Sequence, residues 1–225
     1  MVTKASDLLK EEAKLPGRGR LLKREDEDNA NFEIQRKILE VATQQFVLFG
    51  YRRASISDIA SSVGIGKGSV YLHFKSKREL FLSCQLLEEQ EIYDQIDDIA
   101  ELPEGKRFRA YLECVLTFAT SAPLTRALLS RPTDFASLID DIGAKELQER
   151  AAIGNQYITD KLIEPITKEL SPAEQRTIGT AVSMLVHSVG HLPEVIFEVS
   201  EIQTKDFVET VASILDQGTR NVTHI

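Results

Sequence analysis

Apolar side chains recur every three to four residues along most of the 225-residue chain. One example is the stripe formed by Ile34, Ile38, Val41, Phe46 and Phe49. This spacing predicts amphipathic helices, because side chains three and four positions apart share one face of a helix. No segment alternates apolar and polar residues over the length of a strand. The sequence therefore predicts an all-α fold.

Capping residues and glycines mark where the first helices begin and end. Gly50 is expected to end the first helix, because glycine readily adopts the conformation that follows a helix. Capping boxes at 55–58 and 76–79 predict the starts of a short second helix and of a long helix reaching about residue 100. Gly64 is expected to form the turn before a third short helix at 66–71. Further helices are expected at 104–121, 123–130, 133–170 with a break near Pro165, 172–199 and 204–219.

Residues 55–74 have the pattern of a helix-turn-helix. Two short helices that cross closely need a small side chain at the crossing and a turn residue that tolerates positive φ. Ala60 and Gly64 meet these two needs, and the inner faces are apolar at Ile59, Val63, Ile65 and Val70. The outer face of the third helix is expected to present Lys67, Gly68, Ser69 and Tyr71. Such small and polar residues suit close approach to the major groove of DNA.

The charge distribution agrees with a DNA-binding segment, although the net charge is −8. Residues 31–80 hold eight basic and four acidic side chains, residues 1–30 are balanced, and residues 81–225 hold 12 basic and 24 acidic side chains. A basic segment joined to an acidic one suggests two tasks. The first segment is suited to phosphates and the second is not.

Composition argues against several other classes. Cys84 and Cys114 are the two cysteines, without CxxC spacing, which argues against a disulfide scaffold or a structural zinc site. No stretch approaches the ~20 apolar residues of a membrane helix, and the N-terminus lacks the pattern of a secretory signal. We expect a cytoplasmic protein that does not contact membranes.

A dense motif extends over residues 34–81. It consists of Phe46, Gly50-Tyr51, Ser55-Ile56, Ile59-Ala60, Gly64-Ile65, Gly68-Ser69, Tyr71, His73-Phe74, Ser76-Lys77 and Leu80. In this segment the chain resembles the N-terminal domain of the TetR family of transcriptional regulators. Two residues depart from the family pattern: Gly66 replaces a serine at the start of the recognition helix, and Ser69 replaces a threonine. Because glycine can also cap a helix, we expect this helix to form.

Residues 1–30 are charged and poor in aromatic side chains, and we expect a mobile tail there. The resemblance implies a helix-turn-helix DNA-binding domain at 31–76 and a helical effector-binding and dimerisation domain at 77–225. A helix N-terminus attracts phosphate, which favours Lys77 as an anchor on the DNA backbone. Arg52 and Arg53 are further candidates for backbone contacts. The DNA-binding residues expected from chemistry and resemblance are Ser55, Lys67, Gly68, Ser69, Tyr71, His73 and Lys77.

The C-terminal part is expected to bind a second copy and a small molecule. The helices at 172–199 and 204–219 carry more apolar surface than one neighbour needs, and the resemblance implies that they form a four-helix homodimer interface. The candidate ligand-binding residues are Phe108, Tyr111, Phe118, Phe135, Tyr157, Met184 and His187. We therefore expect a repressor that binds a palindromic double-stranded DNA operator and is released by a small-molecule effector.

Other functions are less consistent with the residues. The main alternative is a ligand-independent DNA-binding or nucleoid-type protein on the same fold, which a middle domain without a cavity would favour. His187 and His191 share one helix face, but two histidines do not complete a metal site. We expect no metal, no cofactor and no catalytic residues, since no catalytic constellation is apparent in the sequence.

Overall fold

The computed structural model describes residues 30–143, 163–192 and 194–222. Every regular element in these ranges is a helix, which confirms the predicted all-α class. The predicted tail lies, except for its last residue, outside the described residues, and so does Tyr157. The described residues form two compact units. The first contains those up to Glu91 together with Pro123–Gly143, and the second contains Ile92–Ala122 together with those after 162.

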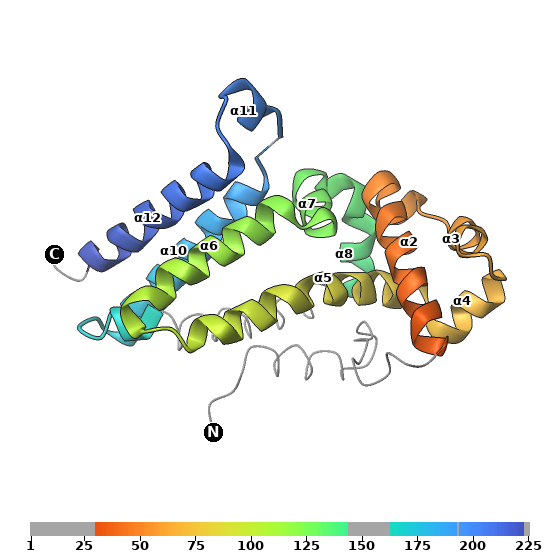
Figure 1. Ribbon diagram of the computed structural model, residues 1–225, viewed down its shortest axis with the longest axis horizontal. Helices are drawn as coiled ribbons and strands as arrows, with labels where there is room; N and C mark the ends of the chain where they lie inside the picture. Colours follow the sequence, from red (N-terminus) through yellow and green to blue (C-terminus); the bar gives the residue numbers. More distant parts are fainter. Residues whose placement is uncertain (1–29, 144–162, 193, 223–225) are drawn as a thin grey trace. The chain divides into compact units, whose positions relative to one another are not determined.

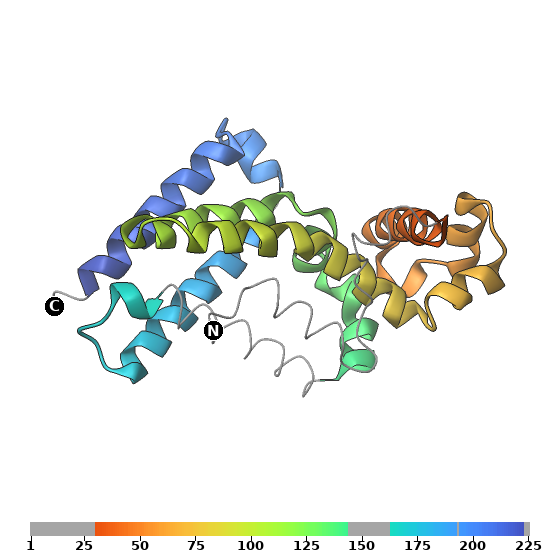
Figure 2. The same cartoon turned by 60° about the horizontal axis from the view of Figure 1, so that its bottom comes forward.

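The first unit begins with three helices that lie together in Figures 1 and 2: α2 (Ala30–Arg53), α3 (Ile56–Val63) and α4 (Lys67–His73). Gly50 interrupts α2 with φ 72° and ψ 173°, so the predicted helix end is present as a kink. Ser55 caps α3 by accepting a hydrogen bond from the Asp58 N–H. Gly64 ends α3 in the left-handed region at φ 82°. The local chemistry of these residues therefore determines the helix ends, as predicted.

Helix α4 forms despite the glycine at its cap. Gly66 is the N-cap and supplies no side-chain hydrogen bond, yet the helix runs two residues beyond the predicted end at residue 71. Buried Val70 and Phe74 explain this length, because each is about 1% exposed. Burial of such side chains stabilises by roughly 1.5–3 kcal/mol each, more than a serine cap contributes.

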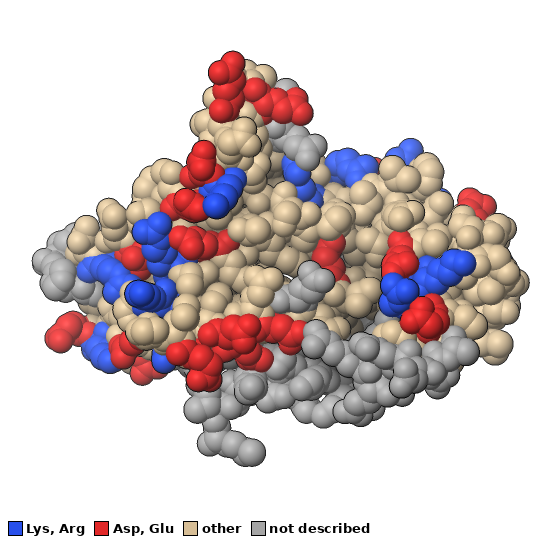
Figure 3. All heavy atoms as spheres, in the orientation of Figure 1, with Lys and Arg blue, Asp and Glu red and all other residues tan. Residues whose placement is uncertain are grey.

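Helix α5 (Lys77–Ala100) contributes residues to both units. It is capped by Ser76, whose Oγ accepts a hydrogen bond from the Glu79 N–H. The Glu79 carboxylate accepts from the Lys75 N–H, one residue before the position expected for a capping box. Acidic side chains gather along the later part of α5 (Figure 3), which agrees with the acidic balance of the chain after residue 80.

The rest of the first unit packs against α2. It comprises α7 (Pro123–Ser130), the 3-10 helix η2 (Pro132–Phe135) and α8 (Ala136–Ile142). The Phe81 ring lies 5.0 Å from Phe46, 5.6 Å from Tyr51 and 5.8 Å from Phe135 between centroids. Helices that are distant in sequence thus share one aromatic core. A helix over 133–170 with a break near Pro165 was expected. The structure has η2 and α8 up to Gly143, where φ is 86°, and a 3-10 helix around Pro165, while 144–162 lie outside the described residues.

The second unit is built on α6 (Glu104–Ser121), whose predicted bounds are confirmed. Helices α10 (Pro172–Gly190) and α12 (Thr204–Val222) both pack on α6 (Figure 1). Short η4 (Glu164–Ile166) precedes α10, and α11 (Glu194–Val199) follows it. The single helix predicted at 172–199 was therefore wrong. Leu192 precedes a proline in the sequence, and a residue in that position is disfavoured in a helix.

Candidate nucleic-acid interface

The crossing of α3 and α4 has the packing that the sequence predicted. Ala60 is buried at the centre of α3, together with Ile59 and Val63, and α4 contributes Val70. The Gly64 N–H donates to the Ala60 carbonyl at 3.0 Å and so turns the chain between the helices. These contacts hold α4 by its inner side and define which of its residues point outward.

The outer side of α4 consists of four exposed residues. Lys67, Gly68, Tyr71 and Leu72 fall within an arc of about 140° on a helix with about 3.6 residues per turn. Ser69 is half-buried at the edge of this set. Three of the four were predicted as DNA contacts, but Leu72 was not. Its position five residues after Lys67 places it on the same arc, and this spacing is the signal that would have indicated it.

Two glycines leave the backbone of this surface bare. A Cβ atom at Gly68 would meet no atom within 4 Å, and one at Gly66 would meet only the Ser69 Oγ, at 3.8 Å. Internal packing therefore does not require glycine at either position. Without side chains here, another molecule can approach the backbone at the start of α4 closely.

Ser55 and His73 flank this surface and both have an internal partner. The Ser55 Oγ accepts from the Asp58 N–H at 3.3 Å, which still leaves the hydroxyl hydrogen able to donate to a phosphate. His73 is half-buried, and its Nδ1 lies 3.5 Å from Nε2 of the buried Gln35 on α2. By helical phase His73 lies outside the arc of Lys67 and Leu72.

Lys77 connects the start of α5 to the end of α2. Its Nζ donates to the Arg52 carbonyl at 3.1 Å and lies 5.0 Å from the centre of the Tyr51 ring. The cation thus interacts with an orphan carbonyl near a helix C-terminus and with an aromatic face. The sequence predicted a phosphate anchor at Lys77. It did not predict the bond to the Arg52 carbonyl, because that bond joins residues 25 positions apart.

Arg53 is also held within the first unit. Its Nε donates to the Phe49 carbonyl at 3.2 Å, and its Nη2 lies 3.9 Å from the Asp134 carboxylate of η2. The Arg131 Nη1 lies 3.7 Å from the other carboxylate oxygen of Asp134, and its Nη2 donates to the Val47 carbonyl. These contacts attach η2 to the last turns of α2, which lead into the helix-turn-helix.

The candidate ligand-binding residues lie in different environments. Phe108 and Tyr111 are buried on α6, and Phe118 of the same helix is half-buried. Phe135 belongs to the aromatic core of the first unit. Met184 and His187 are exposed on α10, where the His187 Nδ1 lies 2.7 Å from the Ser183 carbonyl.

The two thiols are protonated at neutral pH. Burial raises the pKa of Cys84 to about 12 and that of Cys114 to about 11. Among the described residues, no three His, Cys, Asp or Glu side chains are arranged to hold a metal ion. None of the described helices is long and apolar enough to cross a membrane.

The fold and the exposed α4 surface define a class: a helix-turn-helix protein with a helical second unit. Comparison with known proteins identifies the family within this class. Residues 38–84 match the model of the bacterial regulatory proteins of the tetR family. The uncharacterized HTH-type transcriptional regulator YhgD of Bacillus subtilis is 30% identical over 132 residues, which cover 57% of this chain and 67% of YhgD. The chain belongs to the TetR family and is a DNA-binding transcriptional regulator, as the sequence predicted, and not an enzyme.

Other similarities agree with this family. The HTH-type transcriptional regulator QacR of Staphylococcus aureus is 32% identical over 101 residues, which cover 44% of this chain and 54% of QacR. The structure of the fatty acid degradation regulator FadR from Bacillus halodurans superposes with a TM-score of 0.61 at 17% identity, over 80% of this chain and 93% of FadR. A TetR-like regulator from Rhodococcus gives a TM-score of 0.58 at 21% identity, over 80% and 94% of the two chains. At these identities the structural matches support the fold alone.

Proposed function

We propose that this protein is a homodimeric repressor that binds a palindromic operator through the outer side of α4 and is released by a small-molecule effector. The observation that carries the DNA-binding site is the exposed arc of Lys67, Gly68 and Tyr71 beside a buried, well-anchored inner face. A recognition helix of this kind reads base edges in the major groove. Ser55, Ser69 and His73 supply neighbouring donors to the DNA backbone.

Lys77 has two roles in this proposal. Its contacts with Arg52 and Tyr51 join α2 to α5 within the first unit. Its ammonium group can donate up to three hydrogen bonds, and we propose that a phosphate of the DNA backbone is one of its acceptors in the complex. Lys77 would then connect the DNA backbone to α5, the helix that contributes residues to both units.

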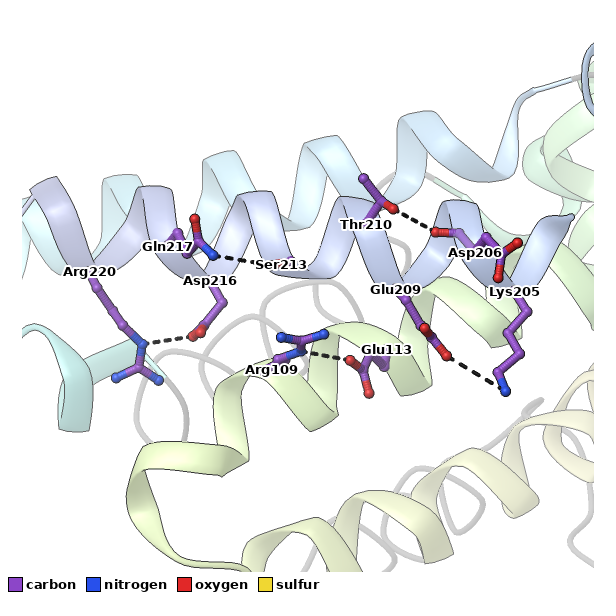
Figure 4. Close-up of polar contacts among 10 residues, drawn as sticks. All are labelled: Arg109, Glu113, Lys205, Asp206, Glu209, Thr210, Ser213, Asp216, Gln217 and Arg220. Carbon is purple, nitrogen blue, oxygen red and sulfur yellow. Dashed lines mark hydrogen bonds and ion pairs between the residues drawn. The ribbon is translucent and has the colours of Figure 1, made fainter. Parts of the chain in front are cut away.

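The dimer interface is assigned to the outer sides of α10 and α12. Helix α12 packs on α6 through Val208 and Ala212, and its charged side chains form pairs along another side (Figure 4). A third side, by helical phase, is apolar and includes the 63% exposed Ile214. On α10, Met184 and Leu185 are similarly exposed. A second copy that supplies the same two helices would cover both apolar sides.

The effector is proposed to act through the second unit. A ligand lowers operator affinity when it favours a conformation whose two recognition helices do not match the half-site spacing of the operator. In a gel shift, the effector is expected to release the protein from DNA. An effector that tightened binding would make the protein a co-repressor-dependent regulator, and operator binding insensitive to every ligand would favour the ligand-independent alternative.

The DNA-binding surface is tested on a duplex that the full-length protein selects from a random-sequence library. We expect Lys67→Ala and Tyr71→Ala to lose specific binding to this duplex while the protein remains dimeric. Loss of one phosphate contact per protomer would lower the salt dependence, the slope of log K against log salt, by about 1 for each Lys67 removed. Lys106→Ala, an exposed lysine of α6, is the matched control and should bind like the wild type. Unchanged binding by both α4 variants would rule out α4 as the recognition helix.

A further inference from the structure

Leu72 is a large apolar side chain with no role in the packing of its own helix. It is 86% exposed, more than any other large hydrophobic side chain of the described residues. Its neighbours Val70 and Phe74, about 1% exposed, anchor α4 to the core of the first unit. An exposed leucine gains nothing from the hydrophobic effect until another molecule covers it.

The anchoring of α4 determines where Leu72 points. Because Val70 and Phe74 hold the inner side, Leu72 lies on the outer arc with Lys67, Gly68 and Tyr71. The start of this arc is cationic and its backbone is bare at Gly68. Its other end is apolar at Leu72. The surface is therefore suited to a partner that combines negative charge with an accessible apolar group.

The major groove of DNA offers that combination. Phosphates supply the charge, and the C5-methyl group of thymine is the apolar group that unmodified base pairs display there. We propose that Leu72 is a specificity-determining residue that contacts a thymine methyl group in each half-site of the operator. This inference rests on the proposed role of α4 as the recognition helix. Beyond that role, the inference names the base that Leu72 selects, thymine, and the group that Leu72 contacts, the C5-methyl group.

The test uses the duplex selected by the full-length wild-type protein, with each thymine replaced in turn by deoxyuridine. This change removes the methyl group and retains base pairing. Fluorescence anisotropy should show that wild-type affinity falls about fourfold per half-site at one thymine, the effect of burying one methyl group. Leu72→Ala should bind the unmodified duplex about fourfold more weakly per half-site and be insensitive to deoxyuridine at that thymine. This non-additivity identifies a direct contact.

Two variants act as controls. Leu72→Met retains an apolar side chain of similar size and should retain the deoxyuridine effect. Leu48→Ala removes another exposed leucine, 64% exposed on α2, and should leave the effect unchanged. Because Leu72 is exposed, its variants should unfold at the wild-type temperature. The library selection can also be repeated with Leu72→Ala. We expect the base preference of this variant to differ from that of the wild type at one position per half-site.

Three outcomes would overturn the inference. One is that no single deoxyuridine weakens wild-type binding. Another is that deoxyuridine weakens wild type and Leu72→Ala equally at every position. The third is that Leu72→Ala changes the oligomeric state and leaves DNA binding unaltered, since Leu72 would then contact protein. These results differ from failure of the proposed function, in which Lys67→Ala and Tyr71→Ala would also bind the selected duplex normally.

Discussion

Gly50 is a residue at which two independent constraints exclude a side chain. Its φ of 72° with ψ of 173° lies in a region that L-residues rarely adopt. A Cβ atom there would lie 2.6 Å from the Asp134 Cβ and 2.9 Å from the Asp134 carbonyl oxygen. The sequence indicated the first constraint, because a glycine after an apolar helical stripe marks a helix end. The second depends on η2, more than 80 residues along the chain.

Gly50→Ala should therefore destabilise the first unit by about 3 kcal/mol, from backbone strain and forced displacement of η2. Gly68→Ala is the matched control. Gly68 lies in a helix with nothing within 4 Å of its missing Cβ, so alanine should be neutral or stabilise by up to about 1 kcal/mol. Chemical denaturation of both variants measures the free energy of unfolding. Equal denaturation midpoints for wild type and Gly50→Ala would contradict the role assigned to the η2 contact.

Helix ends show how far local sequence determines an element. The cap of α10 is a capping box with both reciprocal bonds. The Ser171 Oγ accepts from the Glu174 N–H, and the Glu174 carboxylate accepts from the Ser171 N–H at 2.9 Å. These contacts join residues three positions apart, so the start of α10 was predicted correctly. The end of α10 and the separate α11 were not, because the apolar repeat continues through both segments.

The Ser171 cap should stabilise α10 in a pH-dependent manner. Hydrogen bonds from the Ser171 hydroxyl and backbone N–H lower the pKa of Glu174. A carboxyl group whose pKa is lower in the folded state contributes stability above its unfolded pKa, and this contribution is lost as the pH falls through the folded value. Ser171→Ala should cost about 1 kcal/mol at pH 7, and the difference from wild type should shrink under acid conditions.

Thermal unfolding of both proteins between pH 7 and pH 3 measures this difference. Ser55→Ala is the comparison variant, because the Ser55 cap accepts from the Asp58 N–H and has no reciprocal carboxylate bond of the kind that Glu174 makes. Its effect on stability should vary less with pH. A Ser171→Ala effect that remained constant down to pH 3 would argue against the role of the Glu174 carboxylate.

At the scale of the whole molecule, helices that pack together are not always neighbours in the sequence. The sequence placed the boundary of the DNA-binding domain at residues 76 and 77, where the motif ends. In the structure α7, η2 and α8 pack on α2 in the first unit, and Phe135 of η2 shares an aromatic core with Phe81 of α5 and Phe46 of α2. Residues that follow α6 in the chain thus stabilise the unit that contains the helix-turn-helix.

The proposed dimer gives a prediction at this scale. Met184→Glu combined with Ile214→Glu places charge on the apolar outer sides of α10 and α12, so the variant should sediment as a monomer. Its operator affinity should fall by about 100-fold or more, because the two half-sites would no longer be bound together. Gln217→Glu adds one negative charge on the polar side of α12 and should remain dimeric (Figure 4). A double variant that still sedimented as a dimer would place the interface elsewhere.

The sequence by itself determined the helical class, the caps at Ser55 and Ser171, the turn at Gly64 and the family of the protein. Each depends on residues that are close together in the chain, where spacing translates directly into local geometry. The tertiary structure alone decided that η2 packs against Gly50, that Lys77 binds the Arg52 carbonyl, and that Leu72 is left exposed. These features depend on which distant segments meet, and an apolar repeat specifies that a face is buried without specifying its partner.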